Sequence, residues 1–145
     1  MIVVATAEEK EHIQSLYGDK EIIVTGVGAL NVYKSLNGIS RNTPILNLGY
    51  AGSNNIPIGS VVSVGESRLY HPNVDYCEDA YQLNGKVLCL TSCDFVLCAK
   101  EKDCVFDMEL AFILAMGFKH VRSYKKVSDS LNINEYIENV CKTID

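Results

Sequence analysis

Along much of its length the sequence alternates between short apolar runs and helical patterns, with small or polar residues between them. Residues 1–5 are apolar and largely β-branched, which is typical of a buried strand. Residues 8–16 follow with helical spacing, and Ile13 and Leu16 are the expected apolar contacts of that helix. Residues 21–24 form a second apolar run. This alternation predicts parallel strands joined by helices, which is an α/β fold.

The rest of the chain continues the pattern. Further strands are expected at residues 43–48, 60–69, 87–90, 104–106 and 121–127, and further helices at residues 29–36, 107–116 and 131–143. A chain of 145 residues suits one domain with a single core, and no internal repeat or linker interrupts it. We therefore expect one domain over residues 1–145, a three-layer α/β/α fold around a central mixed, largely parallel sheet.

Charge and hydropathy exclude several classes of partner. The net charge of −5 argues against nucleic-acid binding, and the basic residues Lys119, Arg122, Lys125 and Lys126 are interpreted as a solvated strand end. No apolar run reaches the roughly 18–20 residues that span a bilayer. The N-terminal residues resemble no signal peptide, so a cytoplasmic location is expected, with no membrane partner.

The six cysteines show no pattern of a disulfide framework or of a zinc site. They are Cys77, Cys89, Cys93, Cys98, Cys104 and Cys141. None forms a CxxC pair, and in a reducing compartment such residues behave as small buried hydrophobes. We expect reduced cysteines, no metal and no cofactor.

Parallel sheets bind ligands at the carboxyl ends of their strands. The expected loops there are residues 6–9, 26–29, 49–52, 92–95 and 128–130. Two of them contain glycine turns, through which backbone N–H groups can approach an oxygen-rich ligand, although a plain turn explains them equally well. Glu109 near a helix start is also favourable for the helix itself. Asp129, taken alone, is an N-cap of the terminal helix more readily than a catalyst.

Taken in order, short motifs of the chain resemble one superfamily. They are Gly-Val-Gly at 26–28, Asn-Leu-Gly-Tyr-Ala-Gly at 47–52, Tyr-His at 70–71, Ser-Cys-Asp-Phe at 92–95, Asp-Met-Glu-Leu-Ala at 107–111 and Val-Ser-Asp-Ser at 127–130. The chain resembles the nucleoside phosphorylases and nucleosidases, most closely the methylthioadenosine/adenosylhomocysteine nucleosidases and futalosine hydrolases. The resemblance covers nearly the whole chain and implies a nucleoside phosphorylase-like fold.

The resemblance also implies roles for individual side chains. Asp129 matches the acid that protonates the departing purine, and Ser128 the residue that orients it. Glu109 matches the carboxylate that accepts the ribose hydroxyls, and Met108 the residue beneath the sugar. Phe95 matches the aromatic residue that stacks on the base.

Near the attacking water, the resemblance points to Glu9 as the carboxylate, with the adjacent Glu8 as an alternative. Gly26 and Gly49 belong to the glycine turns that it places around the substrate.

Three positions bear on which relatives the chain is most similar to. Asn47 stands where the phosphorylases have an arginine and the nucleosidases an asparagine, which favours hydrolysis over phosphorolysis. Tyr50 replaces an expected small hydroxyl residue, and its bulk can crowd the water or anion site. Lys125 replaces an expected arginine at the substrate, which keeps the charge but loses the planar fork.

The sequence therefore predicts an enzyme that cleaves the N-glycosidic bond of a small-molecule purine nucleoside. Two alternatives stay open, a relative that binds a nucleoside or nucleobase without turnover, and a phosphorolytic enzyme. The chain is shorter than the resemblance implies, so apolar surface is expected to be exposed and covered in a homodimer.

Overall fold

The computed structural model describes residues 1–18, 20–74 and 76–141. Its strands are β1 (Ile2–Val4), β2 (Ile22–Val24), β3 (Ile45–Gly52), β4 (Val61–His71), β5 (Tyr76–Cys77), β6 (Tyr81–Gln82), β7 (Val87–Thr91), β8 (Cys104–Asp107) and β9 (Val121–Asp129). Its helices are α1 (Ala7–Tyr17), α2 (Ala29–Leu36), α3 (Leu110–Ala115) and α4 (Ile133–Tyr136), and α4 continues as the π-helix η1 (Ile137–Cys141).

The described strands form one mixed sheet. β1 lies between β2 and β3, and all three are parallel. β3 pairs in parallel with β9, whose other neighbour is the antiparallel β4. β4 pairs in parallel with β7, and β7 pairs in parallel with β8. β8 also pairs with β3, antiparallel, at Phe106 and Gly52, so this part of the sheet curls back on itself. The predicted α/β class with a mixed, largely parallel sheet is confirmed.

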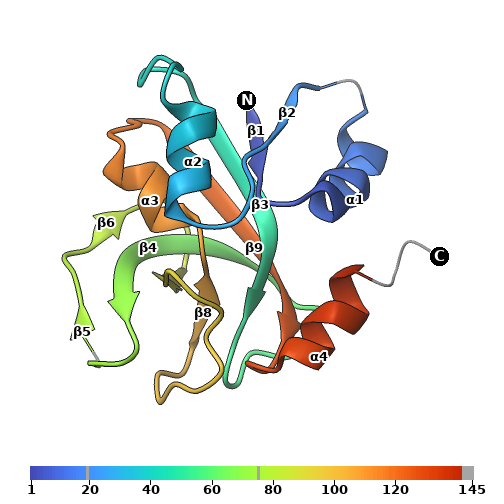
Figure 1. Cartoon of the computed structure of the whole chain (residues 1–145), viewed down its shortest axis with the longest axis vertical. Helices are drawn as coiled ribbons and strands as arrows, with labels where there is room; N and C mark the ends of the chain where they lie inside the picture. Colours follow the sequence, from blue (N-terminus) through green and yellow to red (C-terminus); the bar gives the residue numbers. More distant parts are fainter. Residues whose placement is uncertain (19, 75, 142–145) are drawn as a thin grey trace.

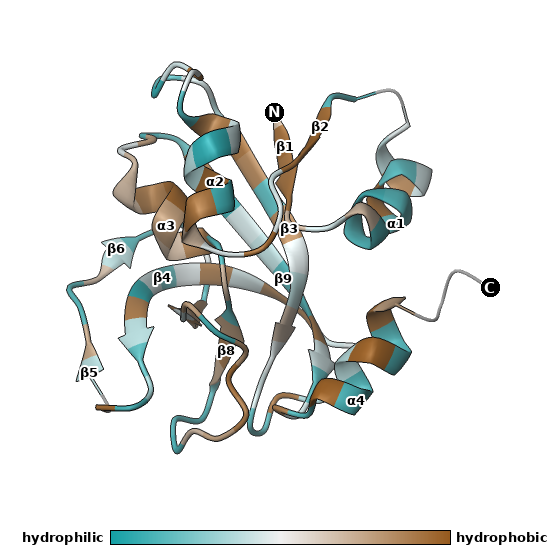
Figure 2. Ribbon diagram, viewed as in Figure 1, coloured by the Kyte–Doolittle hydropathy of each residue, from teal (hydrophilic) through white to brown (hydrophobic). Residues whose placement is uncertain are grey.

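Helices lie on both sides of β3 and β9, with α2 and α3 together on one side and α1 and α4 on the other (Figure 1). Figure 2 shows that β1 and α3 are mostly hydrophobic, whereas α1 is mostly hydrophilic. Val3, Val32 and Ile113 meet in one fully buried cluster that joins β1, α2 and α3. Of the two apolar contacts expected from α1, Ile13 packs against the cluster of β1 and β3. The side chain of Leu16 is 79% exposed, so its predicted contact is wrong.

Several predicted boundaries change. Residues 49–52 are part of β3 rather than a turn, because β9 pairs with β3 along its whole length. The helix expected from residue 107 begins at Leu110, after β8 has run through Asp107. The terminal helix is described only to Cys141, so residues 142–143 of the predicted span lie outside the described residues.

The cysteines are free, but their predicted burial holds only in part. Cys89 and Cys104 are buried and Cys77 is half-buried. The other three, Cys93, Cys98 and Cys141, are exposed. Two of these lie in the irregular segment between β7 and β8, which runs over the surface. Among the described residues, no helix is long and apolar enough to cross a membrane.

Candidate active site

A pocket lies where β1, β3, β8 and β9 end. Seven of the ten predicted site residues line it: Glu9, Tyr50, Phe95, Met108, Glu109, Ser128 and Asp129. Gly26, Gly49 and Lys125 are not part of its lining. Two larger cavities, of 760 and 660 Å³, open elsewhere on the surface, but no carboxylate side chain lines either of them. The pocket is therefore the place where acid–base groups gather.

Glu9 is held in place by backbone N–H groups. Its Oε1 accepts hydrogen bonds from the N–H groups of Ala5 and Thr6, each at 3.0 Å, and its Oε2 accepts one from Tyr50 at 2.8 Å. The Thr6 side chain caps α1 in return, which explains why the helix begins here. Burial raises the pKa of Glu9, and the Lys125 charge partly offsets this effect. Glu8, the alternative carboxylate, is not part of the pocket lining.

Two glycines of β3 make room for carboxylates. A Cβ atom on Gly49 would lie 2.4 Å from Oε2 of Glu9, and one on Gly52 would lie 2.6 Å from Oδ2 of Asp129. Gly49, predicted in a substrate-binding turn, thus lies in a strand behind Glu9. Its missing side chain lets the carboxylate approach the sheet.

Glu109 follows β8, and its side chain reaches the glycine turn between β2 and α2. Its Oε2 accepts a hydrogen bond from the N–H of Gly28 at 3.2 Å. Gly28 and Gly26 both have positive φ, of 88° and 90°, so the turn between β2 and α2 needs glycine at these positions. Burial, and then the nearby Asp107 charge, raise the pKa of Glu109 to about 8.

Asp129 ends β9 and is fully buried. Ser128 Oγ donates to its Oδ1 at 2.7 Å, and the N–H of Leu131 donates to its Oδ2 at 3.1 Å. Burial raises the pKa of Asp129, while these two hydrogen bonds lower it. Asp129 is not the N-cap of the terminal helix, because Asn132 has that role.

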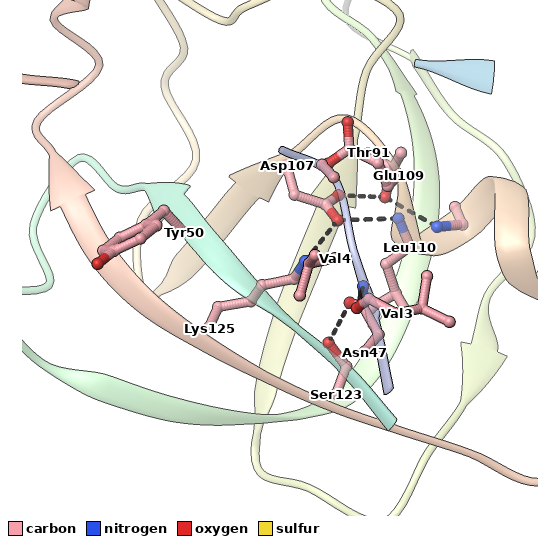
Figure 3. Close-up of polar contacts among 12 residues, drawn as sticks. Val3, Val4, Asn47, Tyr50, Thr91, Asp107, Glu109, Leu110, Ser123 and Lys125 are labelled. Carbon is pink, nitrogen blue, oxygen red and sulfur yellow. Dashed lines mark hydrogen bonds and ion pairs between the residues drawn. The ribbon is translucent and has the colours of Figure 1, made fainter. Parts of the chain in front are cut away.

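Behind the pocket, Lys125 forms a buried ion pair with Asp107, with 3.1 Å between Nζ and Oδ2 (Figure 3). Lys125 is 2% exposed, so its interpretation as part of a solvated strand end is wrong. Asp107 also accepts hydrogen bonds from the Thr91 hydroxyl and from the N–H of Leu110, at the start of α3. Burial raises the pKa of Asp107, but Lys125 and these donors outweigh it, so the pKa is lowered.

The Tyr50 side chain points away from the Asp107–Lys125 pair (Figure 3). Its hydroxyl contacts Nδ1 of His12 on α1, and the two rings meet edge to face. Burial, followed by the Glu9 charge, raises the pKa of Tyr50. Tyr50 therefore lines the pocket as predicted, but its ring turns toward α1.

Two aromatic residues meet at the pocket. Phe95, between β7 and β8, packs edge to face against Tyr136 of α4, with ring centroids 5.7 Å apart. Tyr136 lines the pocket and was not predicted. Its position in the first helix after Asp129 is the only sequence signal that could have found it. Met108, beside Glu109, is half-buried and lines the same pocket.

Solved structures with a similar fold were found by comparison. A methylthioadenosine/adenosylhomocysteine nucleosidase from Neisseria meningitidis, solved with methylthio-immucillin-A, aligns with a TM-score of 0.77 over 96% of this chain and 90% of its own, at 14% identity. The chain has the nucleosidase fold. An MTAN from Chlamydia trachomatis gives 0.79 over 95% and 87%, at 15% identity, and the futalosine hydrolase of Helicobacter pylori gives 0.74 over 98% and 90%, at 16% identity. No protein-family model and no curated protein sequence matches the chain.

This likeness confirms the fold that the motifs predicted. At 14–16% identity, the likeness to these solved structures shows the fold alone. One fold can carry different activities, so the chemistry of this pocket depends on the side chains that line it.

Proposed function

We propose that the protein hydrolyses the N-glycosidic bond of a purine nucleoside. The observation that carries this proposal is the convergence of Glu9, Glu109 and Asp129 on one pocket beside Phe95. Cleavage of this bond builds positive charge on the sugar and negative charge on the base. A site for it needs an acid near the base and carboxylates near the sugar, together with a surface on which the base can stack.

In the proposed reaction, Asp129 donates its proton to the purine as the bond between the base and the anomeric carbon breaks. The raised pKa of Asp129 favours the protonated form that this step requires. Glu109 accepts hydrogen bonds from the ribose hydroxyls. Glu9 takes a proton from the water that attacks the anomeric carbon, so that one nucleoside and one water give one ribose and one free base.

The charge of the pocket supports water rather than phosphate as the acceptor. No lysine, arginine or histidine is among the described residues that line the pocket, whereas four carboxylates are: Glu9, Asp107, Glu109 and Asp129. The nearest cation, Lys125, is engaged by Asp107. A phosphate ion would find no cationic side chain in this lining, and each carboxylate that stays ionised would repel it.

A nucleoside panel tests the proposal. Adenosine, inosine and methylthioadenosine are incubated with the protein, with and without phosphate, and the free base is measured by chromatography. Release of base that does not depend on phosphate supports the hydrolase, and strict phosphate dependence would favour phosphorolysis. Saturable binding without any released base would favour the binding protein without turnover.

The homodimer is also a proposal. Leu16 and Val61 are 79% and 66% exposed and line the same 760 Å³ cavity beside α1. Such apolar surface is covered in many assemblies, and a twofold dimer is the commonest closed form. Light scattering at micromolar concentration should give twice the monomer mass, and a monomer mass at all concentrations would overturn the dimer.

A further inference from the structure

A second cavity, of 660 Å³, lies at the other end of the sheet, where β3 and β9 begin. Three parts of the chain form its walls: the start of β3, the connection between β6 and β7, and the connection between α3 and β9. The polar side chains on these walls are Gln82, Asn84, Lys119, His120 and Arg122.

The basic side chains of this cavity are not paired with any carboxylate that the structure describes. Lys119, His120 and Arg122 are exposed, and in the described part of the chain no hydrogen bond or ion pair engages their side chains. No carboxylate side chain is part of the cavity lining. Glu66, which accepts a long hydrogen bond from Gln82, is itself paired with Arg68. Lys119, His120 and Arg122 thus bring basic groups together on one cavity, although the net charge of the chain is −5.

We propose that this cavity binds a phosphate-bearing small molecule. The Arg122 guanidinium can hold two phosphate oxygens at once, and Lys119 adds a compact positive charge. The Asn84 amide, in the connection between β6 and β7, supplies a neutral donor. Leu46 and Leu83 line the same cavity and offer apolar surface to the rest of the ligand.

The cavity is separate from the nucleoside pocket. Ile45 pairs with Val121 at the cavity end of β3 and β9, and Gly52 pairs with Asp129 at the pocket end. A strand rises about 3.3 Å per residue, so the two ends lie on the order of 20 Å apart. A ligand in the cavity does not reach the carboxylates of the pocket, and this inference does not rest on the proposed function.

Titration with inorganic tripolyphosphate at low ionic strength tests the site by calorimetry. The wild type should bind, and binding should weaken as salt is added. The double variant Lys119→Gln/Arg122→Gln should bind at least about tenfold more weakly, because two charge-assisted contacts are lost. Both side chains are exposed, and an unchanged thermal midpoint shows that the variant is folded.

Two controls separate a built site from general attraction. Lys34→Gln/Lys126→Gln makes the same change in net charge at exposed lysines outside this cavity, so it should bind within about twofold of the wild type. Glu109→Gln, in the nucleoside pocket, should leave tripolyphosphate binding unchanged. Absence of binding to the wild type, or an equal loss in the lysine control, would overturn the proposal.

Discussion

Gly49 and Gly52 lie three residues apart on β3, and each faces a carboxylate of the pocket. Glu9 is fixed by three backbone N–H groups, so it has little freedom to move away from an added side chain. The position of this carboxylate therefore depends on the absence of a Cβ atom at Gly49.

Gly49→Ala should lower turnover of a nucleoside by about 10²-fold, because a displacement near 1 Å at a catalytic group has an effect of that size. Steady-state kinetics measure the loss. Gly38→Ala is the matched control, since no atom lies within 4 Å of its Cβ position, and it should keep full activity. Wild-type turnover in Gly49→Ala would contradict the placement of Glu9 at the reaction.

The proposed acid and the proposed ribose contact can be separated by kinetics. Asp129→Asn keeps the shape but removes the transferable proton, so kcat should fall by roughly 10²–10⁴-fold with KM nearly unchanged. Glu109→Gln should weaken binding and turnover together, because its contacts with the sugar strengthen as positive charge forms. On a 2′,3′-dideoxynucleoside, the Glu109 change should matter little. Unchanged kcat in Asp129→Asn would show that another group is the acid.

At the scale of secondary structure elements, the buried pair of Lys125 and Asp107 joins β9 to the end of β8 and the start of α3. Asp107 serves both as ion-pair partner and as acceptor for the N–H of Leu110. Loss of Lys125 leaves a buried carboxylate with neutral donors only.

Lys125→Met should therefore lower the free energy of unfolding by about 3–5 kcal/mol, as expected when one partner of a buried ion pair is removed. Urea denaturation measures the change. The double variant Lys125→Met/Asp107→Asn should be less destabilised than the sum of the two single variants, because it leaves no unpaired charge. Strict additivity would mean that the pair contributes no coupling.

The sequence predicted most elements because strands and helices follow simple periodic rules, whereas the seven pocket residues came from the resemblance to the nucleosidases. The sequence-based prediction was wrong for residues whose role is set by distant parts of the pocket and not by their own helix or strand. The glycines at 49 and 52 predict a turn, but pairing with β9 continues the strand through them. Their role depends on carboxylates that arrive from distant segments, which no local pattern contains.

Lys125 illustrates a second kind of failure. Ser123, Lys125 and Val127 alternate along β9 and are all buried, whereas Tyr124 and Lys126 between them are exposed. This alternation puts Lys125 on the inner face of the sheet, where a lysine is seldom buried without a partner. Its partner Asp107 lies on another strand, and their pairing appears only when β3, β8 and β9 are folded together.

At the scale of the whole molecule, buried negative charge is concentrated in one place. Glu9, Asp107, Glu109 and Asp129 are all at most 8% exposed, and Lys125 is the only buried cation among the described residues. Lys125 balances Asp107, so the other three carboxylates have raised pKa values, with burial as the largest cause for each. The ligand-free protein should therefore hold protons that its unfolded chain releases.

This imbalance predicts how stability depends on pH. The pKa of Glu109 is about 8 in the folded protein, whereas the ordinary value for a glutamate, which applies to the unfolded chain, is 4.5. Between these values the folded state binds more protons than the unfolded state, so the free energy of unfolding should fall as pH rises from about 4.5 to about 8. Glu9 and Asp129 act in the same direction, whereas the lowered pKa of Asp107 acts only in more acidic solution.

Urea denaturation of the ligand-free protein at pH 5.5 and pH 8 measures the effect, which should be on the order of a few kcal/mol. Glu109→Gln should remove much of the dependence, because its amide does not titrate. Glu11→Gln, at an exposed position on α1, is the control and should keep the wild-type slope. A free energy of unfolding that rises toward pH 8 would contradict the burial of an uncompensated carboxylate in the pocket. A wild-type slope in Glu109→Gln would place the titrating proton on Glu9 or Asp129 instead.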